Sequence, residues 1–349
     1  MARISGKPEL IKKINMSLIR KAITENSPIT KPQLSKKLNL SLPTVNKAVD
    51  ELLKEKVVKI CQNVIKVKGS GKKPIFYEIN GDCITVLTAY FNNNTLFLRE
   101  YNLLSEIKNE KIINTQNGIT VEKFLKYLDE MFLDSVSKKN ITAISVGIPG
   151  VIEKNDCISG AHTLKDFNGI NLKKIIEDKY GIKVVVENDA NLITMGILEK
   201  LDPKIENLIY LFLSRGIGTG IIIDNKLYKG KSNFAGEIGE ILLLDGETIE
   251  EKYKSAIENR DKENLKKIIN FILTVNISLL NPDIVIINSS IFKINQNLLN
   301  KIYIELKEKF GECNVPEIYL DEKEVENGIE GALKMAFLKS NNDFTVVGK

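Results

Sequence analysis

Four short segments are rich in glycine, in polar side chains or in both, and their composition suits the binding of a polar ligand. They are Gly-Ile-Pro-Gly at 147–150, Glu-Asn-Asp-Ala-Asn at 187–191, residues 214–220, and Gly-Glu-Ile-Gly-Glu at 236–240. The first two directly follow apolar runs typical of strands, and α/β folds place ligands at the carboxyl ends of strands. We therefore expect Asn188 and Asp189 to bind a ligand, although either could instead only cap a helix. Residues 214–220 have glycine at every second position and could cradle a phosphate or simply close a hairpin.

Metal and redox chemistry have few candidate residues. The chain has one histidine, His162, and four cysteines without a Cys-x-x-Cys pair. Neither a multi-histidine metal cage within one chain nor a cysteine-based zinc site is indicated, and we expect no metal and no cofactor. His162 is interpreted as a solvent-facing imidazole, or as a residue at the edge of a pocket. With no apolar stretch near the roughly 18 residues of a membrane span, we expect a soluble, cytoplasmic protein with reduced thiols and no membrane partner.

The elements that must position these segments alternate between strands and helices, which predicts an α/β body over residues 81–338. Strands are expected at 84–87, 95–98, 141–146, 183–186, 208–213, 220–223 and 284–288, with helices at 121–137, 172–179, 191–200 and 265–280. Further helical segments follow Asn295. The polar tail at 339–349 is expected to fray.

Basic charge is concentrated before this body. Residues 1–80 carry 17 Lys and Arg against 6 Asp and Glu, a net charge of +11, whereas the whole chain has 50 against 45, or +5. The remaining 269 residues therefore sum to −6. A basic module joined to a mildly acidic body indicates a nucleic-acid-binding domain at 1–80, although a solvated basic face without a ligand would look similar.

The pattern inside residues 1–80 favours DNA binding. An apolar helical stripe runs over 8–26 through Leu10, Ile11, Ile14, Leu18 and Ile23. The spacing Thr30-x-x-Gln33 predicts a capping box for a second helix ending near Leu38, and Ser41 can cap a third helix. Two short helices joined by a tight turn are typical of a helix-turn-helix. Alternating segments at 57–68 and 75–79, with a Gly- and Lys-rich tip between them, predict a wing.

We expect the start of the third helix to enter the major groove of double-stranded operator DNA. Asn46 can pair with adenine, Lys47 with guanine, and a carbon of Thr44 or Pro43 can contact a thymine methyl group. The alternative is a helical module that docks proteins. The candidate DNA-binding residues are Thr30, Lys31, Ser41, Pro43, Thr44, Asn46, Lys47, Ser70, Lys72 and Lys73.

The order of these motifs resembles the ROK family of repressors, uncharacterised reading frames and sugar kinases, over roughly residues 10–338. The resemblance rests on the basic helix-turn-helix followed by GIPG, ENDAN, RGIGTGI, AGEIGE and NPDIVI. It implies an actin-like, ribonuclease-H-like body of two lobes with a sugar in the cleft. It also implies that Asp189 matches the kinase base, that Glu237 contacts sugar hydroxyls, and that Thr163 stands at a sugar-binding asparagine. The implied sugar-binding residues are Gly150, Thr163, Asn188, Asp189, Glu237, Glu240 and Glu251.

Departures from the family pattern indicate a regulator. The kinase motif Asp-x-Gly-Gly-Thr is missing from residues 84–94, and the glycines expected after the NPDIVI segment are Asn288, Ser289 and Ser290. Phosphoryl transfer depends on such phosphate-positioning groups, so we expect no kinase activity. Glu240 stands where the family has a zinc-binding histidine. Because the following loop is short, Glu250 is an alternative to Glu251.

The resulting expectation is a sugar-responsive transcriptional repressor that binds a palindromic operator as a homodimer, or as a tetramer of paired dimers. A sugar or sugar phosphate would close the lobes and change the placement of the two DNA-binding domains. Two alternatives stay open: a constitutive DNA-binding dimer with a vestigial pocket, and an ATP-dependent sugar kinase.

Overall fold

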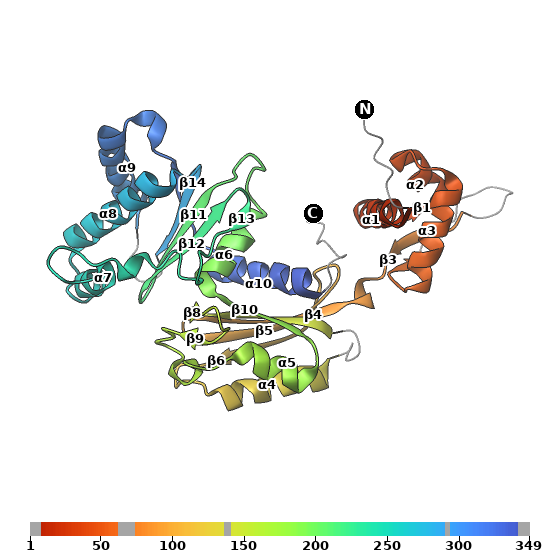
Figure 1. Ribbon diagram of the computed structural model, residues 1–349, viewed down its shortest axis with the longest axis horizontal. Coiled ribbons are helices and arrows are strands. Elements are labelled where there is room, and N and C mark those ends of the chain that lie inside the picture. Colours follow the sequence, from red (N-terminus) through yellow and green to blue (C-terminus); the bar gives the residue numbers. More distant parts are fainter. Residues whose placement is uncertain (1–7, 62–73, 136–140, 290–293, 341–349) are drawn as a thin grey trace.

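The computed structural model describes residues 8–61, 74–135, 141–289 and 294–340. A small head is joined by a narrow neck to a body of two lobes (Figure 1). Each lobe is built on a five-stranded sheet. The predicted fold class, a helix-turn-helix head followed by a two-lobed α/β body, is confirmed.

Three helices and a small sheet form the head. The helices are α1 (Pro8–Asn26), α2 (Lys31–Leu38) and α3 (Leu42–Lys54), and the sheet has the order β1-β3-β2 (Ile29–Thr30, Phe76–Ile79, Val58–Ile60). The predicted caps are confirmed, because Thr30 and Gln33 form a capping box on α2 and Ser41 accepts the Thr44 N–H at the start of α3. Asn39 ends α2 in the left-handed conformation, with φ of 52°. These contacts join near neighbours in the chain, so the sequence reveals them.

The apolar stripe of α1 only partly faces the core of the head. Ile19 and Ile23 are fully buried, whereas Ile11, Ile14 and Leu18 are 51%, 50% and 44% exposed. Consecutive residues of a helix are about 100° apart around its axis, so Leu18 cannot share the buried face centred on Ile19. The helix was predicted correctly, but the face that packs was decided by its neighbours.

The N-terminal lobe has the strand order β10-β7-β4-β5-β6. The strands are β4 (Thr85–Asn92), β5 (Thr95–Asn102), β6 (Ile107–Asn114), β7 (Ile141–Ile148) and β10 (Lys183–Asn188). Helices α4 (Val121–Asp134) and α5 (Leu172–Tyr180) share an apolar core with one face of this sheet. Strand β6 was not predicted, because its sequence IKNEKIIN is mostly polar and its side chains are largely solvent-accessible.

The C-terminal lobe repeats the same arrangement in the order β13-β12-β11-β14-β15. The strands are β11 (Leu208–Leu213), β12 (Ile217–Ile223), β13 (Lys226–Leu227), β14 (Ile284–Ser289) and β15 (Glu317–Leu320), and the helices on its outer face are α7 (Ile249–Glu258), α8 (Lys262–Leu280) and α9 (Gln296–Phe310). In each lobe the first three strands are antiparallel and the last two join in parallel. The two lobes are therefore versions of one fold.

Two helices, α6 (Asp189–Leu198) and α10 (Glu324–Ser340), lie between the two sheets (Figure 1). They approach so closely that a Cβ atom on Gly331 would lie 1.8 Å from the Leu192 carbonyl oxygen, and one on Gly196 would lie 2.0 Å from that of Asn327. Only glycine permits this approach of two backbones. Because α6 begins directly after β10, this packing fixes the position of Asp189.

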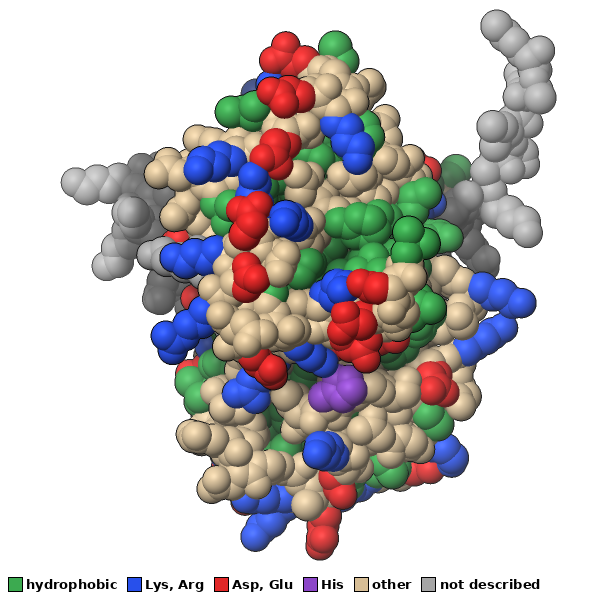
Figure 2. Space-filling view, turned by 90° about the vertical axis from the view of Figure 1, so that its left-hand side faces the viewer, with side chains coloured by type: hydrophobic (Ala, Val, Ile, Leu, Met, Phe, Trp, Pro, Cys, Tyr) green, Lys and Arg blue, Asp and Glu red, His purple; other side chains and the backbone are tan. Residues whose placement is uncertain are grey.

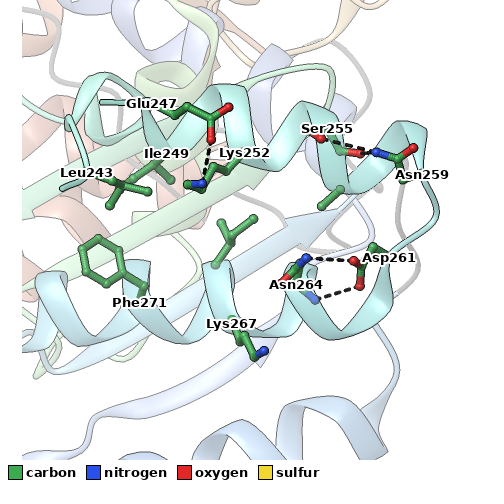
Figure 3. Close-up of a pocket in the computed structure, with 12 residues that line it drawn as sticks. Leu243, Glu247, Ile249, Lys252, Ser255, Asn259, Asp261, Asn264, Lys267 and Phe271 are labelled. Carbon is green, nitrogen blue, oxygen red and sulfur yellow. Dashed lines mark hydrogen bonds and ion pairs between the residues drawn. The ribbon is translucent and has the colours of Figure 1, made fainter. Parts of the chain in front are cut away.

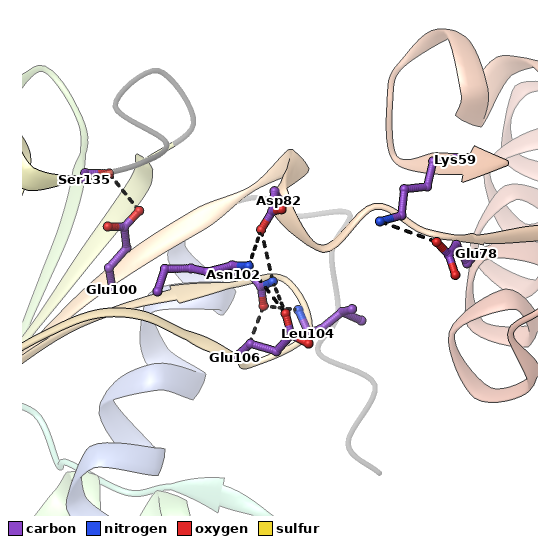
Figure 4. Close-up of polar contacts among 9 residues, drawn as sticks. Lys59, Glu78, Asp82, Glu100, Asn102, Leu104, Glu106 and Ser135 are labelled. Carbon is purple, nitrogen blue, oxygen red and sulfur yellow. Dashed lines mark hydrogen bonds and ion pairs between the residues drawn. The ribbon is translucent and has the colours of Figure 1, made fainter. Parts of the chain in front are cut away.

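The neck is held by a polar network centred on Asn102 (Figure 4). Its side-chain amide donates to Asp82 Oδ1 at 3.2 Å and to Glu106 Oε2 at 2.7 Å, while its oxygen accepts the Leu104 and Glu106 N–H groups. Lys108 pairs with Asp82 at 2.9 Å, and this contact lowers the pKa of the Asp82 carboxyl group. The turn between β5 and β6 therefore clasps the segment that leads from the head into β4.

Among the described residues, no helix has both the length and the apolar composition that a membrane span requires. The four cysteines are free thiols. The described part of the chain contains no group of three His, Cys, Asp or Glu side chains arranged to hold a metal ion.

Candidate functional site

Asn188 joins two of the predicted ligand-binding segments. Its side-chain oxygen accepts the Asn191 N–H at 3.1 Å, so it caps α6, and its amide nitrogen donates to the Gly150 carbonyl oxygen at 3.1 Å. The helix-cap alternative is therefore what the contacts show for Asn188. The same side chain also holds the Gly-Ile-Pro-Gly turn beside the end of β10, which leaves Asp189 as the next side chain at this edge of the sheet.

Asp189 is the first residue of α6 and carries a strongly perturbed carboxyl group. Burial raises its pKa to about 7, and the Ala190 N–H, which donates to Asp189 Oδ1 at 2.8 Å, opposes that rise. A carboxyl group with such a pKa is present in both protonation states near neutral pH. It can therefore donate a hydrogen bond to a ligand hydroxyl or accept one from it.

Glu237 approaches Asp189 from the other lobe. Burial, together with the negative charges of Asp189, Glu240 and Glu250, raises the pKa of Glu237 to about 7. Two carboxyl groups, one directly after β10 and one from the segment that follows β13, thus lie close enough for the charge of Asp189 to raise the pKa of Glu237. This pairing is suited to a polyhydroxylated ligand, because the two groups can share protons with several hydroxyls.

The structure places Glu250, rather than Glu251, beside this carboxyl group. Glu250 Oε2 accepts the Ile217 N–H at 3.1 Å, and its other oxygen pairs with Lys254 at 2.5 Å. Glu251 is exposed, and its carboxylate accepts the Thr248 N–H at 2.8 Å in a capping box on α7. The assignment of Glu251 to the ligand site overlooked this Thr-x-x-Glu signal in the sequence.

The other predicted sugar-binding residues are less tightly held. Thr163 and Glu240 are exposed, as is His162, in agreement with the interpretation of a solvent-facing imidazole. Phe167, near Thr163, is instead fully buried against Phe91 and Phe124. The structure thus connects Gly150 and Asn188 by a hydrogen bond. It places Asp189 near enough to Glu237 for their negative charges to interact, while Thr163 and Glu240 lie at the surface.

Residues 214–220 close a hairpin. Leu213 pairs with Ile217 across the antiparallel strands β11 and β12, and the Ser214 N–H donates to the Gly216 carbonyl oxygen at 3.0 Å. The hairpin alternative is therefore confirmed. Gly218 and Gly220 lie within β12 and pack against α6, where a Cβ on Gly220 would lie 1.8 Å from Thr194 Oγ1.

The candidate DNA-binding residues divide into three groups. Ser41, Pro43 and Lys47 are exposed at the start of α3, and Thr44 and Asn46 beside them are partly exposed. Two residues at the start of α2 are engaged within the head, since Thr30, the N-cap, forms the capping box and Lys31 pairs with Asp50 at 2.5 Å. The wing residues Ser70, Lys72 and Lys73 lie outside the described residues.

Comparison with known proteins finds a matching family model for both the head and the body of the chain. A family model described as "ROK family" matches residues 101–251, and one described as "Winged helix-turn-helix DNA-binding" matches residues 13–59. The xylose repressor of Caldicellulosiruptor bescii is 33% identical over 247 residues, which cover 68% of this chain and 61% of that repressor. The chain belongs to the ROK family. The xylose repressor of Bacillus subtilis is 30% identical over 248 residues, covering 67% of this ROK chain and 61% of the repressor.

Solved structures show the same ROK fold. A ROK family transcriptional regulator described as a homolog of the E. coli Mlc protein covers 95% of this chain and 97% of its own, with a TM-score of 0.66 and 18% identity. The ROK hexokinase from Thermus thermophilus covers 73% of this chain and 98% of its own, with a TM-score of 0.57 and 17% identity. At such identities these likenesses show the fold alone. The matched regions span 61% of the length of the two xylose repressors.

A separate hollow of about 430 Å³ lies between α7 and α8 of the ROK body (Figure 3). Its lining combines apolar side chains, among them Ile249, Ile268 and Phe271, with polar ones such as Lys252 and Asn259. None of the predicted sugar-binding residues lines it. The outer face of the C-terminal lobe around these helices mixes acidic, basic and apolar side chains (Figure 2).

Proposed function

We propose that this ROK protein is a sugar-responsive DNA-binding repressor without kinase activity, and that its effector is a neutral sugar such as D-xylose. The observation that carries the proposal is the junction of a helix-turn-helix head with a body in which Asp189 and Glu237, from different lobes, lie close enough for their charges to interact. Named relatives support the effector, because the similar proteins from Caldicellulosiruptor bescii and Bacillus subtilis are xylose repressors. The carboxyl groups of Asp189 and Glu237 also favour a neutral ligand over a sugar phosphate, which they would repel when ionised.

The first strand of the body argues against phosphoryl transfer. Tyr90 of β4 is fully buried, and its ring packs directly against Gly328 and Gly147. A Cβ atom on Gly328 would lie 2.2 Å from the ring, and one on Gly147 would lie 2.6 Å from it. Strand β4 then turns into β5 with Asn92 paired to Thr95. An aromatic ring therefore stands in the region where a kinase of this family needs a phosphate-binding turn, so positioning of a nucleotide phosphate is not expected.

The neck supports coupling between the ligand and the DNA. The Asn102 network holds Asp82, just after the last strand of the head, to the N-terminal lobe, and Leu103 beside it packs against the head core, so closure of the lobes would move the head together with that lobe. In a homodimer or a tetramer held by the body, such a movement would change the distance between two recognition helices. Operator affinity would change with it, because half-site spacing is fixed by the DNA.

The test is to add D-xylose to the protein alone and to the protein bound to DNA selected from a random pool. At 100 times its dissociation constant the sugar should stabilise the fold by about 2.7 kcal/mol. It should also change the amount of bound DNA. No thermal shift with neutral sugars, amino sugars or sugar phosphates, in a protein that binds DNA, would favour a constitutive DNA-binding dimer. ATP turnover in the presence of a sugar would instead favour a kinase.

The recognition helix gives a second test. Lys47→Ala should weaken binding to the selected DNA, because Lys47 is exposed near the start of α3 and makes no ion pair among the described residues. If Lys47 contacts phosphate, the slope of log affinity against log salt concentration should fall in magnitude by about one unit. If it contacts guanine, the free-energy preference for guanine over other bases should fall by about 1–3 kcal/mol. Fluorescence anisotropy at several salt concentrations measures both. Lys301→Ala, an exposed lysine of α9, is the control, and equal binding by both variants would remove α3 from the interface.

A further inference from the structure

One loop of the C-terminal lobe makes two polar contacts with the N-terminal lobe. This loop, residues 228–236, follows β13. Lys229 Nζ donates to Glu187 Oε2 at 2.6 Å, and Asn233 Nδ2 donates to the Ile152 carbonyl oxygen at 3.0 Å. Glu187 belongs to β10 and Ile152 to β8 (Val151–Ile152), so both contacts cross between the lobes.

Glu187 needs a cation at this position. Its side chain is only 2% exposed, whereas that of Lys229 is 35% exposed. Its Oε1 accepts the Asn188 N–H at 3.0 Å and the Asn191 side-chain amide at 2.9 Å. Lys229 is the cation that the described residues bring to the remaining oxygen, and a buried carboxylate without a partner is strongly unfavourable.

The ion pair also reaches the candidate ligand site. Glu187 binds the backbone N–H of Asn188, and the Asn188 side chain holds the Gly150 carbonyl oxygen. Lys229 is therefore linked through Glu187 to two predicted sugar-binding residues of the opposite lobe. Asp189 is the next residue in the chain, so any shift of this segment moves its carboxyl group.

We infer that Lys229 is a positioning residue that holds the two lobes closed around the effector. Separation of the lobes would withdraw Lys229 and leave the buried Glu187 carboxylate unpaired, so the ion pair favours the closed arrangement. A ligand that contacts both lobes then binds more tightly, because less of its binding free energy is used to close them. The inference rests on the proposed function for the identity of the ligand, but not for the closure itself.

Hydrogen exchange on the ligand-free protein tests the closure without any sugar. Lys229→Met should increase deuterium uptake in peptides covering residues 150–152 and 183–191, with no change in α4 or α8. Lys173→Met is the matched control, because Lys173 is 28% exposed and pairs with Asp156 at 2.8 Å within the N-terminal lobe. The inference would be overturned if Lys229→Met took up deuterium at residues 150–152 and 183–191 to the same extent as the wild type.

Titration calorimetry with D-xylose tests the effect on the ligand. Lys229→Met should weaken binding about 10-fold or more, since removal of one partner leaves a buried charge. Lys229→Arg should recover most of the affinity. The double variant Lys229→Met with Glu187→Gln should lose less than the sum of the two single variants, since no unpaired charge remains. Strictly additive losses, or wild-type affinity in Lys229→Met, would also overturn the inference. If the wild type binds no D-xylose, the proposed effector fails, and the exchange experiment still decides the role of Lys229.

Discussion

Asp189→Asn should abolish the response to the sugar while leaving DNA binding at the level of the wild type. Asp189 is the carboxyl group at the start of α6, and its raised pKa lets it both donate and accept hydrogen bonds near neutral pH. Asparagine keeps the size of the side chain but cannot change its protonation state, and it presents two donors at one end. We expect at least a 100-fold loss of D-xylose affinity, on the order of 3 kcal/mol for a buried polar group left without its partner.

The measurement is release of fluorescent operator DNA as D-xylose is added, together with operator affinity without sugar. Asp178→Asn is the control, since Asp178 is an exposed residue of α5 that pairs only with Lys174 among the described residues. Because the head and the cleft are separate parts of the molecule, the operator affinity of Asp189→Asn should equal that of the wild type. Normal release of DNA by D-xylose from Asp189→Asn would contradict the assignment of the ligand site.

Glu237→Gln should stabilise the protein at pH 8 and not at pH 4.5. The pKa of Glu237 is about 7 in the folded chain, against an ordinary value of 4.5, because burial and the charge of Asp189 oppose ionisation. The folded state therefore holds a proton that the unfolded state has lost, and the free energy of unfolding falls as the pH rises from 4.5 through 7. Glutamine removes this titration, so the variant should gain about 1–3 kcal/mol over the wild type at pH 8.

Denaturant unfolding at several pH values between 4.5 and 8 measures this difference. The exposed Glu258→Gln in α7 is the control, and its stability relative to the wild type should not change over this range. The stabilised Glu237→Gln variant should bind D-xylose more weakly, as is common when a strained site residue is relaxed. A stability difference that is constant with pH would show that Glu237 ionises normally and lies outside the charged cluster.

The face that α1 presents to the head core illustrates how packing decides what periodicity leaves open. The stripe through Ile11, Ile14 and Leu18 is regular, yet the buried residues are Ile19 and Ile23. A helix with apolar residues on adjacent faces can pack by either one, and the choice depends on α2, α3 and β3. Similarly, β6 had no apolar run to reveal it, since among the described strands it lies at the edge of its sheet and pairs with β5 alone.

The sequence by itself determined what depends on near neighbours in the chain. The caps Thr30 and Ser41, the helix-turn-helix they frame, and the order of glycine-rich and acidic motifs follow from spacings of a few residues, because the hydrogen bonds involved are local. Only the tertiary structure decided which carboxylates meet. Glu250 approaches Glu237 because α7 packs against the turn at residues 238–240, whereas the capping box that engages Glu251 is a local Thr-x-x-Glu signal. Lys229 reaches Glu187 across 42 positions of the chain, because folding brings the segment after β13 against the end of β10, and no local pattern encodes that approach.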